Sequence, residues 1–136
     1  MISSMYDYFG LNAEPIKWTP KSKPRSNASK NHKKALEIVR QLLPMVHIYE
    51  ECKLPLGIKK NIYIDIFIPS FSLAIEIDGR QHSEFNKHFH RDKLSFYRAQ
   101  KNDRLKEEWC EVNNINIIRL KEQDARNWRK QIEAAI

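Results

Sequence analysis

Hydrophobic and polar positions alternate along two neighbouring segments, residues 62–68 and 72–78, and this pattern predicts two β-strands. Residues 69–72 between them contain one proline and two serines, which favours a tight turn and therefore an antiparallel hairpin. A turn centred on Ser70 and Phe71 pairs Ile68 with Leu73. The same register places the carboxylates of Asp65 and Glu76 opposite each other, with Cβ atoms about 5 Å apart.

The patterns in the rest of the chain predict further helices and strands, in the overall order α-β-β-β-α-β-α. The predicted elements are a helix at 29–43 with Ser29 as its N-cap, strands at 47–53, 62–68, 72–78 and 115–120, a mostly helical segment at 86–113 and a terminal helix at 124–136. Leu105, Trp109 and Val112 stand at helical spacing, and Trp128 and Ile132 are predicted to point inward. Residues 1–28 hold three prolines and predict a basic, largely extended arm before a single domain at 29–136.

The facing pair of acids is the strongest chemical signal in the sequence. Like charges directly opposite each other in an apolar sheet are destabilising, and a bound divalent cation such as Mg²⁺ or Mn²⁺ removes the conflict. Asp78 follows Glu76 by two residues and therefore points to the same side of the strand. The alternative is a solvated sheet face, because acids are common on edge strands.

Composition narrows the possible partners. The chain has 24 Lys and Arg against 17 Asp and Glu, a formal net charge of +7, which favours an anionic partner such as nucleic acid. Its two cysteines are too few for a disulfide framework and suit a reducing cytoplasm. No apolar run approaches the roughly 20 residues of a membrane span, so no membrane association is expected.

The hairpin and the run Glu76-Ile77-Asp78-Gly79-Arg80-Gln81-His82, followed by Asp103-Arg104-Leu105, resemble the PD-(D/E)XK nuclease superfamily. The resemblance is closer to its Vsr-like branch, which includes very-short-patch-repair endonucleases and the phage EDxHD homing endonucleases. It covers about residues 29–135 and implies an α/β, restriction-endonuclease-like αβββαβ core with a central mixed sheet flanked by helices. It also implies that Asp65, Glu76 and the carbonyl of Ile77 bind Mg²⁺ or Mn²⁺.

The sequence departs from the superfamily pattern where a lysine usually follows two residues after the glutamate, because Asp78 stands there. The resemblance implies that His82 can work near the attacking water, with Gln81 as a neighbouring polar candidate. His82 also has a side chain whose ordinary pKa suits proton transfer near neutrality. A residue of the first helix often completes such sites. Helical projection favours His32 over Glu37, and a site with no first-helix residue stays open.

Basic residues at two places predict contacts with nucleic-acid phosphates, and the resemblance implies that the nucleic acid is double-stranded DNA. They are Lys17, Lys21, Lys23 and Arg25 in the arm, and Arg80, Lys87, His88, His90, Arg91, Lys93, Arg98, Lys101 and Arg104 around the long helix. Asp103 either orients His82 or a water, or pairs with Lys101 or Arg104.

These observations predict a divalent-metal-dependent DNA endonuclease of phage or mobile-element, homing-type origin, acting in the cytoplasm of a bacterial host. The alternatives are a structure-directed nuclease, such as a junction resolvase or mismatch-nicking enzyme, and an inactive basic DNA-binding module on the same scaffold. A homodimer is possible under the first two, and the sequence fixes neither the recognition site nor nicking against double-strand cleavage.

Overall fold

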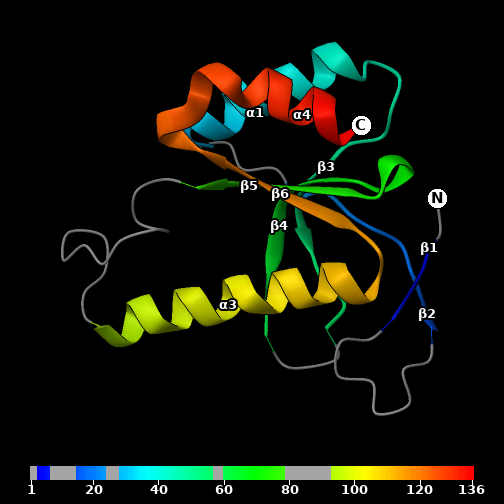
Figure 1. The fold of residues 1–136 in the computed structure, drawn as a ribbon. Helices are drawn as coiled ribbons and strands as arrows, with labels where there is room; N and C mark the ends of the chain where they lie inside the picture. Colours follow the sequence, from blue (N-terminus) through cyan, green and yellow to red (C-terminus); the bar gives the residue numbers. More distant parts are fainter. Residues whose placement is uncertain (1–2, 7–14, 24–27, 57–59, 79–92) are drawn as a thin grey trace.

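The computed structural model describes residues 3–6, 15–23, 28–56, 60–78 and 93–136 (Figure 1). A four-stranded mixed sheet in the order β3-β4-β5-β6 lies at its centre. Its strands are β3 (Tyr49–Lys53), β4 (Tyr63–Ile68), β5 (Leu73–Asp78) and β6 (Asn116–Lys121). The first three strands pair antiparallel, whereas β6 runs parallel to β5. A parallel neighbour needs a long crossover, and helix α3 (Lys93–Val112) supplies it.

Helices cover both faces of the sheet, with α1 (Lys30–Leu42) and α4 (Trp128–Ala135) on one and α3 on the other (Figure 1). Each face has its own apolar core. Ile66, Ile75 and Trp128 belong to the α1/α4 core, and Phe67, Ala74 and Trp109 belong to the α3 core. The expected α/β class, with a mixed sheet flanked by helices, is therefore confirmed.

The boundaries of the elements follow local chemistry. Helix α1 begins after Ser29, whose hydroxyl accepts a hydrogen bond from the His32 amide at 3.1 Å, as expected of an N-cap. The hairpin turn is a short 3₁₀ helix, η1 (Pro69–Phe71), followed by Ser72 in the left-handed region. The terminal α-helix starts four residues later than predicted, because the 3₁₀ helix η2 (Glu122–Asn127) precedes it.

Val112 follows the helical spacing of Leu105 and Trp109 but does not share their burial. Its side chain is 45% exposed, whereas Leu105, Trp109 and Cys110 are buried. At about 100° per residue, Val112 lies about 200° around the helix from Cys110, so a buried stripe that includes Cys110 turns Val112 to solvent.

The N-terminal region contains a pairing that the sequence pattern did not predict. Strands β1 (Ser3–Tyr6) and β2 (Pro15–Trp18) form a two-stranded antiparallel sheet, with Pro15 at the first position of its strand, where proline is tolerated. Beyond it, the Lys23 amide donates to the Glu50 carbonyl at 2.8 Å, so this part of the arm lies against β3. No helix among the described residues is long and apolar enough to cross a membrane.

Trp18 attaches the arm to the α3 core. Its ring stacks on Phe67, with centroids 5.9 Å apart, and meets Trp109 edge-on at 5.6 Å. Two aromatic contacts worth about 0.5–1.5 kcal/mol each predict that Trp18→Ala lowers the free energy of unfolding by about 1–3 kcal/mol. Urea denaturation measures the change, with Met45→Ala, at a residue 93% exposed, as the control. Equal stability of the two variants would contradict the attachment.

Candidate metal centre

Asp65 lies on β4, and the register of the hairpin determines whether it faces Glu76 as predicted. Ile66 pairs with Ile75 and Ile68 with Leu73, which confirms the predicted register of the hairpin. One further step along that register brings Asp65 opposite Glu76. The Asp65 carboxylate also accepts a hydrogen bond from the Ile77 amide at 2.9 Å, so strand β5 fixes the orientation of this carboxylate.

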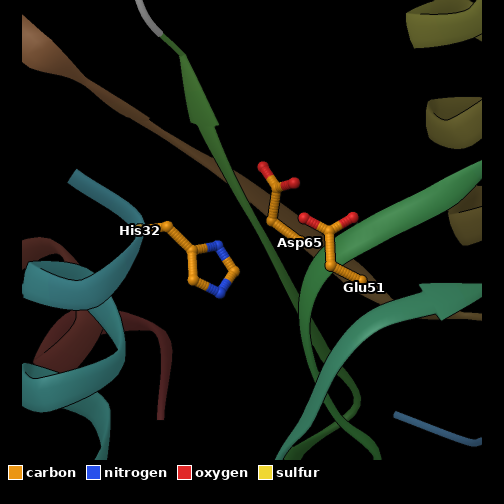
Figure 2. Close-up of side chains that lie close together, drawn as sticks. All are labelled: His32, Glu51 and Asp65. Carbon is orange, nitrogen blue, oxygen red and sulfur yellow. The ribbon is translucent and has the colours of Figure 1, made fainter. Parts of the chain in front are cut away.

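Asp65 forms a cluster with His32 and Glu51, which come from two other elements (Figure 2). Each side chain offers one ligand atom, and these atoms lie within 4.8 Å of one another. The N-cap at Ser29 places His32 in the first turn of α1, where it is buried. Two carboxylates and an imidazole drawn together in this way match the ligands that divalent metals take.

His32 is held by a second contact. Its Nε2 lies 3.1 Å from Oε1 of Glu50, a carboxylate-to-histidine hydrogen bond of the kind that orients metal-ligating histidines. When Nε2 carries the proton of this bond, Nδ1 keeps its lone pair for a metal. Glu37, the other first-helix candidate, is exposed and accepts a hydrogen bond from Gln41 instead. The structure therefore brings His32, and not Glu37, to Asp65.

Glu51 was not predicted as a site residue. Its φ of 47° lies in the left-handed region, which is unusual for a residue inside a strand and costs about 1–3 kcal/mol. The pairs Glu50–Ile66 and Cys52–Ile64 flank it, so Glu51 lies opposite Asp65 across the β3–β4 ladder. The distorted backbone thus carries one of the two carboxylates of the cluster.

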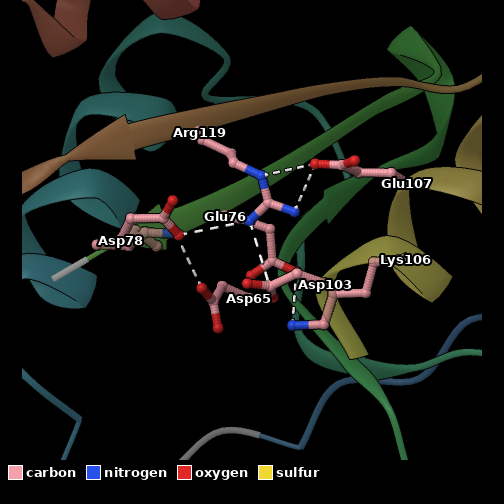
Figure 3. Close-up of polar contacts among 8 residues, drawn as sticks. Asp65, Glu76, Asp78, Asp103, Lys106, Glu107 and Arg119 are labelled. Carbon is pink, nitrogen blue, oxygen red and sulfur yellow. Dashed lines mark hydrogen bonds and ion pairs between the residues drawn. The ribbon is translucent and has the colours of Figure 1, made fainter. Parts of the chain in front are cut away.

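Glu76, next to Asp65, is buried with 3% exposure and forms an ion pair with Lys106 of α3, whose Nζ is 2.9 Å from Oε1 (Figure 3). Burial and the neighbouring Asp65 carboxylate raise the pKa of Glu76 well above its ordinary value, and the Lys106 ammonium only partly opposes them. Glu76 therefore carries an electrostatic strain that a bound cation relieves.

Lys106 was also not predicted as a site residue. Burial alone would lower the pKa of Lys106, but the Glu76, Asp65 and Asp103 carboxylates together raise it. The side chain therefore stays a cation. It can stabilise negative charge next to the carboxylates and is unsuited to act as a base.

Asp78 lies in a separate ion-pair network with Arg119 of β6 (Figure 3). Guanidinium nitrogens of Arg119 lie 3.5 Å from Oδ1 of Asp78, 3.9 Å from Oδ1 of Asp103 and 3.0 Å from Oε1 of Glu107. Asp103 thus has Arg119 as an ion-pair partner. The sequence had suggested Lys101 or Arg104 as its partner and did not suggest Arg119. The network joins β5, β6 and α3.

Some of the other predicted residues lie outside the described residues, and the rest can be placed. Those outside the described residues are Arg25, Arg80, Gln81, His82, Lys87, His88, His90 and Arg91. The described and exposed basic residues are Lys21 and Lys23 in the arm, and Lys93, Arg98, Lys101 and Arg104 on α3. Lys17 lies in β2. Ile77 contributes its amide to Asp65, and its predicted role as a carbonyl ligand stays a prediction.

The chain is similar to two viral proteins over part of its length. It is 38% identical over 60 residues to Uncharacterized protein 307L of Invertebrate iridescent virus 6 and, over the same length, to Uncharacterized protein 033L of Invertebrate iridescent virus 3. The match covers 44% of this chain but only 30% and 31% of the two viral proteins. No family model matches the chain, and no solved structure matches it.

Proposed function

We propose that this protein is a divalent-metal-dependent DNA endonuclease, with Mg²⁺ or Mn²⁺ as its cofactor. One observation carries the proposal: Asp65 stands between the His32–Glu51 pair and the buried Glu76–Lys106 ion pair. A cation-binding group and a fixed ammonium thus lie side by side, which suits hydrolysis of a phosphodiester.

The residues present fit a hard divalent cation. Asp65, Glu51 and Glu76 supply oxygen ligands and His32 a nitrogen, and burial together with the neighbouring Asp65 carboxylate raises the pKa of Glu76. Asp65 and Glu76 would hold the ion, with His32 or Glu51 completing the set. When bound, such an ion polarises the scissile phosphate and lowers the pKa of a water.

The protein's own residues then have separate tasks. The Ile77 amide fixes the Asp65 carboxylate, and Glu50 fixes the ring of His32. The Lys106 ammonium offsets negative charge that develops on the phosphate. His82, which follows the end of β5 in the sequence, stays the proposed proton acceptor, with Gln81 beside it. The net charge of +7 and the exposed Lys and Arg on α3 favour DNA as the polyanion bound.

The test is incubation of the full chain with supercoiled plasmid, with Mg²⁺ or Mn²⁺ and with EDTA. We expect nicked or linear product with the metal and none with EDTA. Binding without cleavage under every metal tested would instead support the alternative, an inactive DNA-binding module.

Metal binding is tested separately by melting curves, with Asp65→Asn as the variant. A metal at about 100 times its Kd adds about 2.7 kcal/mol to the native state, which is several degrees in Tm. Asp65→Asn should raise the Tm of the metal-free protein by removing repulsion, and should weaken metal binding about tenfold or more. Glu37→Gln, which removes an exposed acid of α1, is the matched control and should change neither. A less stable metal-free Asp65→Asn, with no metal response in wild type, would contradict the site.

A further inference from the structure

A groove leads away from the candidate metal centre along α3. A cavity of about 250 Å³ is lined by Asp65, Glu51 and Lys106, together with Asn61, Ile62 and Asn102. A second cavity of about 340 Å³ is lined by the same Asn61, Ile62 and Asn102. The three shared residues make the two cavities neighbours, so the site opens into a longer groove.

The far half of this groove has its own chemistry. Besides the shared residues, the lining of this half consists of Lys60, Leu94, Tyr97, Arg98 and Lys101. Three of these are cations, and none of the described residues lining this cavity is acidic. The acids lie only at the other end, at Asp65 and Glu51. The groove therefore runs from a cationic half to the metal-binding half.

The first half of α3 forms one wall and leaves apolar groups uncovered. Leu94, Tyr97, Arg98 and Lys101 recur at helical spacing on one face, and Leu94 and Tyr97 are each 54% exposed. The buried residues of α3 all lie in its second half, from Leu105 onward, and the first turns extend past β3 and β4 (Figure 1). Lys60, three residues before β4, donates a hydrogen bond from its Nζ to Oδ1 of Asn102 at 3.4 Å and so joins the two walls.

Resting on the proposed nuclease function, we propose that this groove binds an unpaired DNA strand whose phosphates lead to Asp65. Cations that follow a backbone, with an exposed aromatic ring among them, are the arrangement by which proteins hold single strands, because a base can stack on the ring. The bases of an intact duplex are stacked on each other and cannot reach Tyr97. From Tyr97 to Lys106 the helix rises about 13 Å, the span of a few nucleotides.

The substrate class that follows is DNA with a single-stranded portion beside the cleavage point, such as an overhang or a flap. Tyr97 receives a base, and Lys60, Arg98 and Lys101 neutralise the phosphates on either side of it. This narrows the proposed function toward the structure-directed nucleases among its alternatives.

The experiment measures binding by fluorescence anisotropy in EDTA, so that no cleavage occurs. The probes are a labelled DNA single strand, the matching blunt duplex, the same duplex with an overhang, and an RNA strand of the same sequence. Tyr97→Ala should weaken binding of the single strand and of the overhang about 5- to 150-fold and that of the blunt duplex little. Tyr97→Phe keeps the ring and should bind as wild type does. Lys101→Ala should lower the salt dependence, the slope of log K against log salt, by about 0.7.

Phe71→Ala is the matched control, since Phe71 is 39% exposed on η1 and lines neither cavity. The proposal falls if Tyr97→Ala weakens all probes equally or none, or if RNA binds more tightly than DNA. Plasmid nicking by wild type with no effect of Tyr97→Ala on binding overturns the groove and leaves the nuclease standing. Tyr97-dependent binding without nicking under any metal overturns the nuclease and leaves the groove standing.

Discussion

Glu76→Gln should lower the rate of metal-dependent nicking by about 10³-fold or more and, without metal, should raise the Tm at neutral pH. The rate falls because several kcal/mol of charge stabilisation disappear with a metal ligand, at 1.36 kcal/mol per factor of ten. The Tm rises because a neutral amide of the same shape ends the cost of burying a charge and the repulsion with Asp65, which together outweigh the lost attraction to Lys106.

The pH dependence of stability measures the effect of the Glu76 charge on the free energy of unfolding separately from its effect on the nicking rate. In the unfolded chain Glu76 has its ordinary pKa of 4.5, whereas in the native protein the pKa is raised. Above pH 4.5 and up to the raised native value, the native state binds more protons, so the stability that Glu76 contributes falls as pH rises. Wild type and Glu76→Gln should be equally stable near pH 4 and diverge toward pH 8. Glu108→Gln, at an exposed acid of α3, should run parallel to wild type. A gap between wild type and Glu76→Gln that does not vary with pH would contradict the assignment.

Lys106→Met should reduce nicking by about 10²–10³-fold, the usual loss when one fixed donor of transition-state charge stabilisation is removed. Metal binding should persist, because Asp65 and Glu76 remain. The variant should therefore still show a metal-induced rise in Tm, which separates loss of catalysis from loss of the site. Lys106→Arg keeps the cation and should recover part of the rate.

The same variant should also be less stable without metal, by up to about 3–5 kcal/mol at pH 8, since Glu76 loses its buried partner. The loss should shrink as the pH falls and Glu76 takes up a proton. A Lys106→Met protein that nicks within a few-fold of the wild-type rate would remove Lys106 from the proposed chemistry.

The hairpin and its register could be predicted because two physical constraints agree. The short turn at Pro69 fixes which residues face each other, and a shift of a strand by one residue would turn its side chains from one apolar core toward the other. His32 could be predicted for a similar reason, since the angular position of a residue on a capped helix is known once its apolar stripe is known.

Glu51 could not be predicted, because nothing in the sequence marks a glutamate that adopts a left-handed conformation within a strand. Lys106 had a weak signal. It precedes Trp109 by three residues and therefore lies on the inward side of α3, but its partner Glu76 is thirty positions away. The β1–β2 pairing also depends on tertiary contacts, since neither strand has an alternating pattern long enough to stand out from the arm.

The attachment of Trp18 has a consequence for the order in which the chain is made. Its partner Trp109 lies 109 − 18 = 91 residues later in the sequence. At about 5–20 residues per second, a ribosome needs about 5–18 s to synthesise that interval. During this time the indole of Trp18 lacks one of its two aromatic partners, and the α3 core cannot close. High contact order of this kind slows folding, and the contact of Trp18 with Trp109 forms only after α3 has been synthesised.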